Sequence, residues 1–297
     1  MEDMEEKYLT EFKPITLENA KLIARGGTGE CYRIDEDKIV KLYYQDFPED
    51  QIIEEKYCSR LALVSGIPTA ISYDMVQCGN RKGVAYEMIG AKTVAEIMRD
   101  DPGRAEEMGI RTAQVAKLMH SAEGDKSRLI SATYPVRYAL EKNTIFPASV
   151  VEGATAFMDE LDRYDSFVHG DFQVNNIMID GEESILIDMG GFGKGCPMFD
   201  LATMYFCMTD SPEAQEGGVS KFTGLPVSLH KVYWNALVRE YFGCADPEEA
   251  MKTLPEARLM EKILLLKEIF FVILFGSRYP GKYTDRILAK AIAEYGK

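Results

Sequence analysis

The sequence feature that most restricts the fold is the segment 168–190, VHGDFQVNNIMIDGEESILIDMG. Its apolar runs at 177–179 and 185–187 flank a loop that starts with Asp-Gly, and this pattern predicts a β-hairpin. In an antiparallel pair, the start of the first strand lies beside the end of the second. We therefore expect Asn176 and Asp188 to lie together at the open end of the hairpin.

Three polar side chains around this hairpin have the chemistry to handle a metal ion and a proton. Asn176 and Asp188 offer hard oxygen ligands of the kind that Mg²⁺ prefers. Asp171, five residues before Asn176, can accept the proton of an attacking hydroxyl. Phosphoryl transfer needs these two functions and little covalent participation by the protein.

The three histidines and six cysteines form no metal-binding pattern. His169 is close to Asp171 in the sequence, where a general-base role and a structural role in holding the loop are both open, and we favour the structural one. His120 and His230 have no ligand-like spacing, and we interpret them as incidental. The cysteines are scattered without a CxxC pair, which indicates free thiols in a reducing compartment, so we expect a cytoplasmic protein.

The composition restricts the partners. The formal net charge of −14, from 34 basic and 48 acidic residues, argues against nucleic acid or an anionic membrane surface as the main partner. It fits a cationic substrate, although solubility is the simpler explanation. The longest apolar stretch, 263–276, is broken by Lys267 and Glu268 and is too short to span a bilayer. Residues 1–6 lack the pattern of a signal peptide, so we expect no membrane association.

The sequence pattern changes near residue 90 from strand-like runs to helical apolar stripes, which predicts two lobes and an α+β fold. Short runs separated by turn residues predict strands at 21–24, 30–34, 38–43, 71–76 and 83–88, and a helical segment is predicted at 49–64. Beyond residue 90, apolar stripes predict helices at 105–120, 150–161, 229–242 and 256–275. The hairpin is the one clear β element of that part. We expect a small β-rich N-terminal lobe with one helix, residues 1–90, and a larger, mainly helical C-terminal lobe, residues 91–297.

Two features of the first lobe suit a nucleotide. The turn Gly26-Gly27-Thr28-Gly29 would let backbone N–H groups approach a triphosphate without obstruction by side chains, although most such clusters are plain hairpin turns. Lys41 lies within the apolar run IVKLY, where a lysine needs a partner or a ligand. Glu55 on the following helix is a suitable ion-pair partner, and the adjacent Glu54 is the alternative.

The motifs, taken in order, resemble the protein-kinase-like superfamily. H-G-D-x-x-x-x-N at 169–176 and D-M-G at 188–190 match its H-R-D-x-x-x-x-N and D-F-G elements. The HGD form and the run PMFDLA at 197–202 resemble the aminoglycoside phosphotransferase and choline kinase branch in particular. The matching elements extend from Gly26 to Ala202, about two-thirds of the chain.

This resemblance implies a protein-kinase-like bilobal fold in which residues 1–90 bind the nucleotide and residues 91–297 carry catalysis and substrate binding. It implies that Asp171 is the catalytic base or orients the attacking hydroxyl. Asn176 and Asp188 would hold Mg²⁺.

The resemblance also implies roles in binding ATP. Lys41, paired with Glu55, would contact the α- and β-phosphates. The segment from Glu87 to Ile89 would form the hinge whose backbone reads adenine. Asp200 would brace the catalytic loop.

Several positions depart from the protein-kinase pattern. Tyr32 stands where a third glycine is expected, Met189 replaces the usual aromatic residue, and Gln173 occupies the position where Ser/Thr protein kinases carry lysine. Only eleven residues separate Asp188 from Asp200, and no A-P-E follows. Because this leaves no room for an activation loop and a peptide platform, the sequence argues for a small-molecule kinase.

The leading hypothesis is an ATP- and Mg²⁺-dependent phosphotransferase that acts on a hydroxyl of a small molecule. Aminoglycosides, choline or ethanolamine, sugars and homoserine are candidate acceptors, and the acidic balance favours an amine-bearing one. The alternatives are a protein kinase-like Ser/Thr phosphotransferase and a nucleotide-binding pseudokinase switch. The switch is disfavoured because Lys41, Asp171, Asn176 and Asp188 are all present. The acceptor, the choice between ATP and GTP, and the oligomeric state stay open.

Overall fold

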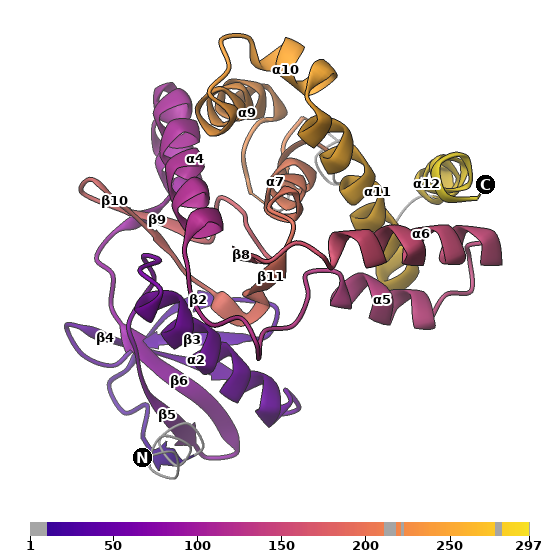
Figure 1. The fold of residues 1–297 in the computed structure, drawn as a ribbon. Helices are drawn as coiled ribbons and strands as arrows, with labels where there is room; N and C mark the ends of the chain where they lie inside the picture. Colours follow the sequence, from indigo (N-terminus) through magenta and orange to yellow (C-terminus); the bar gives the residue numbers. More distant parts are fainter. Residues whose placement is uncertain (1–10, 211–217, 221–222, 277–280, 297) are drawn as a thin grey trace. The chain divides into compact units, whose positions relative to one another are not determined.

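The computed structural model describes residues 11–210, 218–220, 223–276 and 281–296. The chain forms two compact units, Met1–Lys92 with Met178–Phe192, and Thr93–Ile177 with Gly193–Lys297 (Figure 1). Most of the predicted hairpin therefore belongs to the first unit. The assignment of nucleotide binding and catalysis to lobes that meet at residue 90 stays a prediction.

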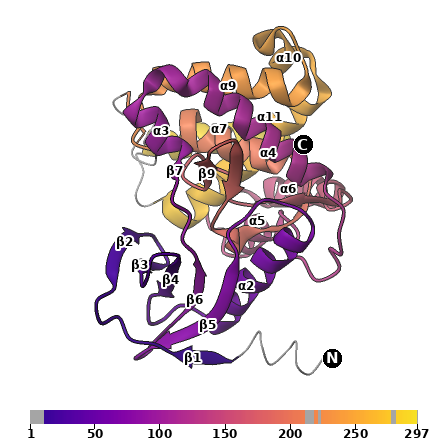
Figure 2. The same cartoon turned by 90° about the vertical axis from the view of Figure 1, so that its left-hand side faces the viewer.

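The first unit is built on a six-stranded sheet with the order β1-β5-β6-β4-β3-β2 (Figure 2). β1 is parallel to β5, and the other neighbours are antiparallel. The strands are β1 (Phe12–Pro14), β2 (Lys21–Arg25), β3 (Gly29–Arg33), β4 (Lys38–Tyr43), β5 (Ser72–Cys78) and β6 (Arg81–Glu87). The five longer strands confirm the prediction. The three-residue β1 is too short to produce an alternating pattern and was not predicted.

The helix α2 (Glu49–Val64) packs against β5 and β6 of this sheet. Because successive side chains of a strand point to opposite faces, β4 places Val40 and Leu42 in one core cluster and Tyr43 in another. Tyr43 shares its cluster with Ile52 of α2. Lys41, two residues before Tyr43, therefore lies on the face of the sheet that α2 covers.

The predicted hairpin is present as β9 (Ile177–Asp180) and β10 (Glu183–Leu186), which are neighbours in a sheet. Its second strand is followed by the short 3-10 helix η2 (Met189–Gly191), which packs against α2. The sequence thus identified the hairpin and its turn, and in the structure the second strand begins two residues and ends one residue earlier than predicted.

The second unit contains two groups of helices. The helices α4 (Ala105–Ser121) and α9 (Val227–Phe242) pack along each other, as Figures 1 and 2 show. In the other group, α11 (Pro255–Phe275) contacts α5 (Tyr134–Glu141) and α12 (Gly281–Tyr295), and α12 contacts α6 (Ala148–Leu161). The unit also contains α3 (Val94–Asp100), η1 (Pro102–Arg104), α7 (Met198–Tyr205), the π-helix η3 (Phe206–Asp210) and α10 (Pro247–Thr253). No helix in the described ranges has both the length and the apolar character needed to cross a membrane.

Short strands that the sequence did not predict border the 169–176 loop. β8 (Ser166–Val168) pairs antiparallel with β11 (Gly193–Gly195), with Val168 opposite Gly193. A further two-residue strand, β7 (Lys92–Thr93), precedes α3. The expectation of one β element beyond residue 90 was therefore wrong, because strands of two or three residues leave no period in the sequence.

Candidate active site

A cluster of charged side chains lies on the α2 side of the sheet in the first unit. The Lys41 ammonium donates to both carboxylate oxygens of Glu55, with Nζ–O distances of 2.8 and 3.0 Å. It also donates to Oδ1 of Asp188 at 2.7 Å. The Tyr86 hydroxyl donates to Glu55 Oε1 at 3.2 Å. Of the two glutamates that the sequence left open, the partner of Lys41 is Glu55 and not Glu54.

Helix geometry explains this choice between adjacent glutamates. Successive residues are rotated by about 100° around a helix, so Glu54 and Glu55 lie on different sides of α2. Glu55 is 5% exposed, whereas the Glu54 carboxylate accepts a contact from the Cys58 thiol at 3.8 Å. Only Glu55 reaches the buried face of the sheet.

The electrostatics of the cluster keep Lys41 charged. Burial alone would lower the pKa of the ammonium. The charges and hydrogen bonds of Glu55 and Asp188 outweigh burial, so the pKa of Lys41 lies above its ordinary value. A cation fixed by two carboxylates suits the binding of phosphate oxygens.

Asp188 enters the cluster from a left-handed backbone conformation, with φ 61° and ψ 62°. L-residues other than glycine adopt this conformation only uncommonly, with Asn and Asp the most tolerant. It turns the chain directly into η2, where Gly190 lies against the Glu55 carboxylate. Strained backbone of this kind is concentrated at functional sites.

The turn Gly26-Gly27-Thr28-Gly29 joins β2 to β3, and the Gly26 N–H donates to the Gly29 carbonyl at 2.9 Å. A Cβ atom at Gly29 would collide with the Leu42 carbonyl oxygen, so glycine is required there by the packing of the sheet. At Gly27 a Cβ atom would meet nothing. The N–H groups of Gly27 and Thr28 have no partner in the part of the chain that the structure describes, and they can serve an anion.

The expected hinge lies at the end of β6. The Glu87 N–H donates to the Ile71 carbonyl at 3.0 Å, and the Met88 N–H donates to the Asp37 carbonyl at 2.8 Å. The Ile89 N–H has no hydrogen-bond partner among the described residues. Within this segment, Ile89 is therefore the backbone donor left for a base.

A second cluster lies in the 169–176 loop of the second unit. The Asn176 side-chain amide donates to Asp171 twice, to its carbonyl at 2.9 Å and to Oδ2 at 2.8 Å. Gln173 Nε2 approaches the same Oδ2 at 3.4 Å. The other carboxylate oxygen of Asp171, Oδ1, makes no hydrogen bond with a described residue. The loop thus fixes the Asp171 carboxylate by one oxygen and leaves the second one open.

Asp200, at the start of α7, holds the loop through hydrogen bonds to its backbone. Its carboxylate, which is fully buried, accepts the N–H of His169 at 2.8 Å and the N–H of Gly170 at 3.0 Å. Gly170 has a φ of 80°, which explains why glycine stands in the HGD motif. The His169 ring accepts the Asp171 N–H at 3.3 Å, which is a structural contact of the kind that the sequence favoured.

The interpretation of His120 as incidental was wrong. Its Nε2 lies 3.0 Å from Asp200 Oδ2, and its Nδ1 lies 2.8 Å from the Tyr241 hydroxyl. Burial would raise the pKa of Asp200, but the hydrogen bond and charge of His120, together with His169, lower it below its ordinary value. His120 and Asp200 are eighty residues apart, so no local spacing could reveal the pair.

The donor atoms of these clusters fit a hard divalent cation. Because Asn176 Nδ2 faces Asp171, its Oδ1 is left without a hydrogen bond among the described residues. The Asp188 carboxylate is about half exposed. The described part of the chain holds no group of three His, Cys, Asp or Glu side chains that could bind a metal, and Mg²⁺ is commonly bound by one or two protein ligands with substrate phosphates. The proximity of Asn176 to Asp188 stays a prediction.

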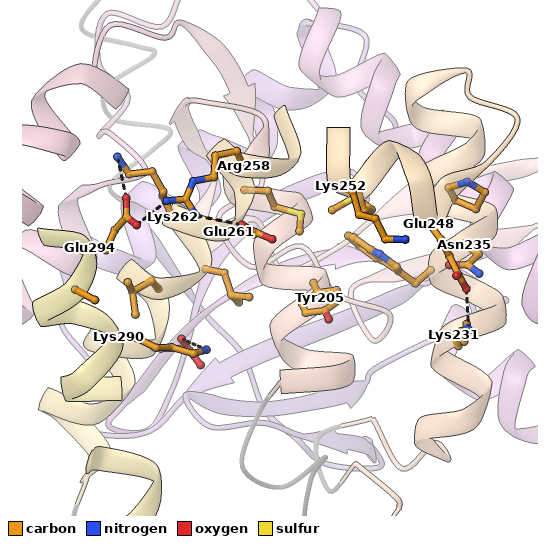
Figure 3. Close-up of a pocket in the computed structure, with 18 residues that line it drawn as sticks. Tyr205, Lys231, Asn235, Glu248, Lys252, Arg258, Glu261, Lys262, Lys290 and Glu294 are labelled. Atoms are coloured by element: carbon orange, nitrogen blue, oxygen red, sulfur yellow. Dashed lines mark hydrogen bonds and ion pairs between the residues drawn. The ribbon is translucent and has the colours of Figure 1, made fainter. Parts of the chain in front are cut away.

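A pocket of about 810 Å³ lies among α7, α9, α10, α11 and α12 of the second unit (Figure 3). Its wall contains the Tyr205–Trp234 aromatic pair and several ion pairs, including Lys231 with Glu248 at 2.8 Å. None of the residues that the sequence predicted for the active site lines this pocket. The candidate active-site residues therefore lie in the two clusters and not in this pocket.

Comparisons with known proteins are consistent with this geometry. A family model described as the phosphotransferase enzyme family matches residues 20–226. No curated protein matches the sequence.

Several solved structures share the fold. An ADP-bound aminoglycoside phosphotransferase is 16% identical, with a TM-score of 0.59 over 93% of each chain. An amicoumacin kinase in complex with AMP-PNP, Ca²⁺ and Ami is 14% identical, with a TM-score of 0.60 over 99% of this chain and 92% of that one. A choline/ethanolamine kinase family protein from Mesorhizobium loti is 15% identical, with a TM-score of 0.56 over 93% and 87%. At these identities the likeness establishes the fold, which is the α+β protein-kinase-like fold that the sequence predicted.

Proposed function

Because the chain belongs to the phosphotransferase enzyme family, we propose that it moves the γ-phosphate of ATP to a hydroxyl of a small molecule, with Mg²⁺ as cofactor. The observation that carries this proposal is the Lys41 ammonium held between Glu55 and Asp188. The fixed Lys41 cation can bind the phosphates of a nucleoside triphosphate, and the half-exposed Asp188 carboxylate can bind its metal ion.

The nucleotide contacts follow from the first unit. Lys41 would bind the α- and β-phosphates, with Glu55 fixing its direction. The turn Gly26-Gly27-Thr28-Gly29 would add the free N–H groups of its middle residues to the phosphates. The Ile89 N–H, next to the Glu87 end of β6, would read the adenine. Similar structures were solved with ADP, AMP-PNP or ATP, which supports a nucleotide donor.

Asn176 and Asp188 would hold the metal through an amide oxygen and a carboxylate oxygen. When bound, Mg²⁺ neutralises the charge that develops on the transferring phosphoryl group. Lys41 donates a hydrogen bond to Oδ1 of Asp188, and this contact would hold the carboxylate in place before any ligand arrives.

Asp171 would receive the acceptor. Its Oδ2 is fixed by Asn176, so Oδ1 can accept a hydrogen bond from the acceptor hydroxyl and orient its oxygen for in-line attack. As the new O–P bond forms, the bond between the γ-phosphorus and the β,γ-bridging oxygen would break and ADP would leave, while the hydroxyl proton would pass to this carboxylate. The brace by Asp200 keeps the loop in this position.

A small acceptor is supported by the short chain between Asp188 and Asp200, which has no room for a peptide platform. Similar structures carry gentamicin or streptomycin. The acidic composition favours an amine-bearing acceptor. All six cysteines are free thiols, which supports a reducing, cytoplasmic location.

The test is the variant Asp171→Asn. It keeps the shape of the side chain and removes the proton acceptor, so turnover should fall by at least about a hundredfold, while the affinity for Mg-ATP stays nearly unchanged. A screen of amino sugars, amino alcohols, amino acids and sugars with Mg-ATP, followed by ADP release, supplies the acceptor. Asp165→Asn is the matched control, because Asp165 is an exposed carboxylate just upstream of the same loop.

Undiminished turnover in Asp171→Asn would refute the assignment. Tight ATP binding without transfer to any acceptor or to water would instead indicate a nucleotide-binding switch. Phosphate found on Ser or Thr of an added protein, by mass spectrometry, would indicate the protein-kinase alternative.

A further inference from the structure

The helix α11 carries three cationic side chains, and one of them has no acidic ion-pair partner among the residues that the structure describes. Arg258 pairs with Glu294 at 2.7 Å, and Lys262 pairs with the same carboxylate at 3.5 Å. Lys267 is half-buried, yet it makes no hydrogen bond or ion pair with any residue that the structure describes. The adjacent Glu268 does not compensate it, because that carboxylate pairs with two cations of α12.

The Lys267 ammonium lies at the start of α7, where the catalytic loop is held. Its Nζ is 5.6 Å from the centroid of the Phe199 ring. Phe199 directly precedes Asp200, whose carboxylate binds the backbone of His169 and Gly170. One step further along that loop is Asp171. The cation therefore lies beside the segment that anchors the loop of Asp171, the residue that would receive the acceptor hydroxyl.

The electrostatics agree with this position. Burial lowers the pKa of Lys267, and the charges of Asp200 and Asp171 act in the opposite direction. Asp200 already accepts hydrogen bonds from the loop and from His120. Neither Asp200 nor Asp171 touches the ammonium directly, so its positive charge remains available to a ligand.

We propose that Lys267 binds an oxyanion on the acceptor side of the reaction, next to the hydroxyl that Asp171 receives. The proposal rests on the function proposed above and narrows the acceptor to molecules that carry a carboxylate or phosphate group. Desolvating an ammonium without an acidic partner is unfavourable, and an anionic ligand offsets this cost. An amino acid with a side-chain hydroxyl would meet this requirement and would also carry the amine that the acidic composition favours.

The same chemistry fits a second source of oxyanion, the phosphoryl group during its transfer. The experiment therefore compares acceptors that differ only by a carboxylate: glycerate with glycerol, serine with 2-amino-1,3-propanediol, and gluconate with sorbitol. Each is tested with Mg-ATP on the full chain and on Lys267→Met and Lys267→Arg. ADP release without an acceptor reports hydrolysis, in which water takes the place of the hydroxyl. Lys252→Met is the control, because Lys252 is an exposed lysine of the same unit that makes no hydrogen bond or close ion pair with a described residue.

If the acceptor supplies the oxyanion, the unmodified chain should prefer the charged member of a pair. Lys267→Met should then raise KM for that member by at least about tenfold, since one charge-assisted hydrogen bond is lost. Hydrolysis should stay unchanged, and Lys267→Arg should retain most of the preference. If the phosphoryl group supplies it, Lys267→Met should lower kcat for hydrolysis and for every acceptor alike. Lys252→Met should match the unmodified chain in both cases.

The proposal is overturned if Lys267→Met changes neither hydrolysis nor the discrimination between paired acceptors. A preference for the neutral members that persists in the variant, with hydrolysis unchanged, would overturn it too. A purely structural role predicts a lower midpoint of urea unfolding and no rescue by arginine. Should the methionine variant fail to fold, Lys267→Gln provides the same comparison. Failure of the unmodified chain to bind or hydrolyse ATP would refute the proposed function itself, which separates the two failures.

Discussion

The two clusters of candidate residues differ in how their charges are held. Around Lys41, every charge has a charged partner, and the partners come from a strand, a helix and the segment after a hairpin. Around Asp171, the organising charge is Asp200, which is bound by two backbone N–H groups and one histidine. The first arrangement positions side chains, whereas the second positions the backbone of a loop. Substitutions should therefore affect ligand binding in the first cluster and loop conformation in the second.

The largest effect should come from Asp200→Asn. The amide removes the charge and places a second donor against the N–H groups of His169 and Gly170. Breaking a buried charged network of this kind costs about 3–5 kcal/mol in the free energy of unfolding, and the displaced loop should reduce turnover by about a hundredfold. Trp234, the single tryptophan, reports unfolding of the second unit in urea. A stability equal to that of Asp165→Asn would contradict the role of Asp200.

The pH dependence of stability provides a second test of the Asp200→Asn substitution. The folded state lowers the pKa of Asp200, so the unfolded chain binds the proton first, near a pKa of about 3.9. The contribution of the charge is therefore present above about pH 4 and is lost as the pH falls further. Urea unfolding of both proteins across this range should give a stability difference that shrinks in acid. If the stability difference between the two proteins grew as the pH fell, the Asp200 charge would not stabilise the folded state in the way described.

An intermediate effect should come from Lys41→Met. It leaves Glu55 and Asp188 without their common cation, and we expect a loss of about 1–3 kcal/mol in stability and at least about tenfold in Mg-ATP affinity. Adding Glu55→Gln should recover part of the stability but not the affinity, because the buried carboxylate is then neutral. Urea unfolding and titration calorimetry measure the two quantities.

Glu54, the residue next to Glu55 on α2, provides a control for this prediction. Glu54→Gln should change stability by less than about 0.5 kcal/mol, as most surface substitutions do. If Glu54→Gln and Glu55→Gln behaved alike, the ion pair with Lys41 would not have the importance assigned to it.

The smallest effect should come from Gln173→Ala. Its amide approaches Asp171 Oδ2 at 3.4 Å, a long contact, while Asn176 holds the same oxygen at 2.8 Å. Turnover should fall by about two- to fivefold, which corresponds to one weak hydrogen bond. Steady-state kinetics at saturating Mg-ATP measure it. A loss as large as that of Asp200→Asn would mean that the side chain of Gln173, and not the buried brace, positions the loop.

Elements with a regular pattern were predicted with accurate bounds. β4 and α2 begin and end at the predicted residues, because the apolar run of β4 follows the turn Asp35-Glu36-Asp37 and the helix ends before Gly66 and Pro68. Asp171 and Asn176 could be paired from the sequence because they lie in one short loop. The three-residue strands β8 and β11 gave no such pattern.

What sequence could not provide was tertiary contact. His120 meets Asp200 from a different helix, and nothing near either residue marks the other. In the sequence, Lys267 is an interruption of an apolar stretch. Only the neighbours of α11 show that it has no acidic ion-pair partner among the described residues. The choice between Glu54 and Glu55 likewise needed the direction in which each side chain leaves the helix.

The left-handed backbone of Asp188 restricts which substitutions position 188 can accept during evolution. Two independent requirements restrict the residue at this position. Folding accepts the few residues that tolerate a positive φ, chiefly glycine, asparagine and aspartate. A metal ligand must also supply an oxygen donor. A library selected for folding alone should therefore return all three residues. Aspartate and asparagine both supply such an oxygen, but only aspartate also keeps the charged contact with Lys41. Relatives that carry glycine at this site would retain the fold after losing the metal ligand, and those that carry asparagine would lose the ion pair.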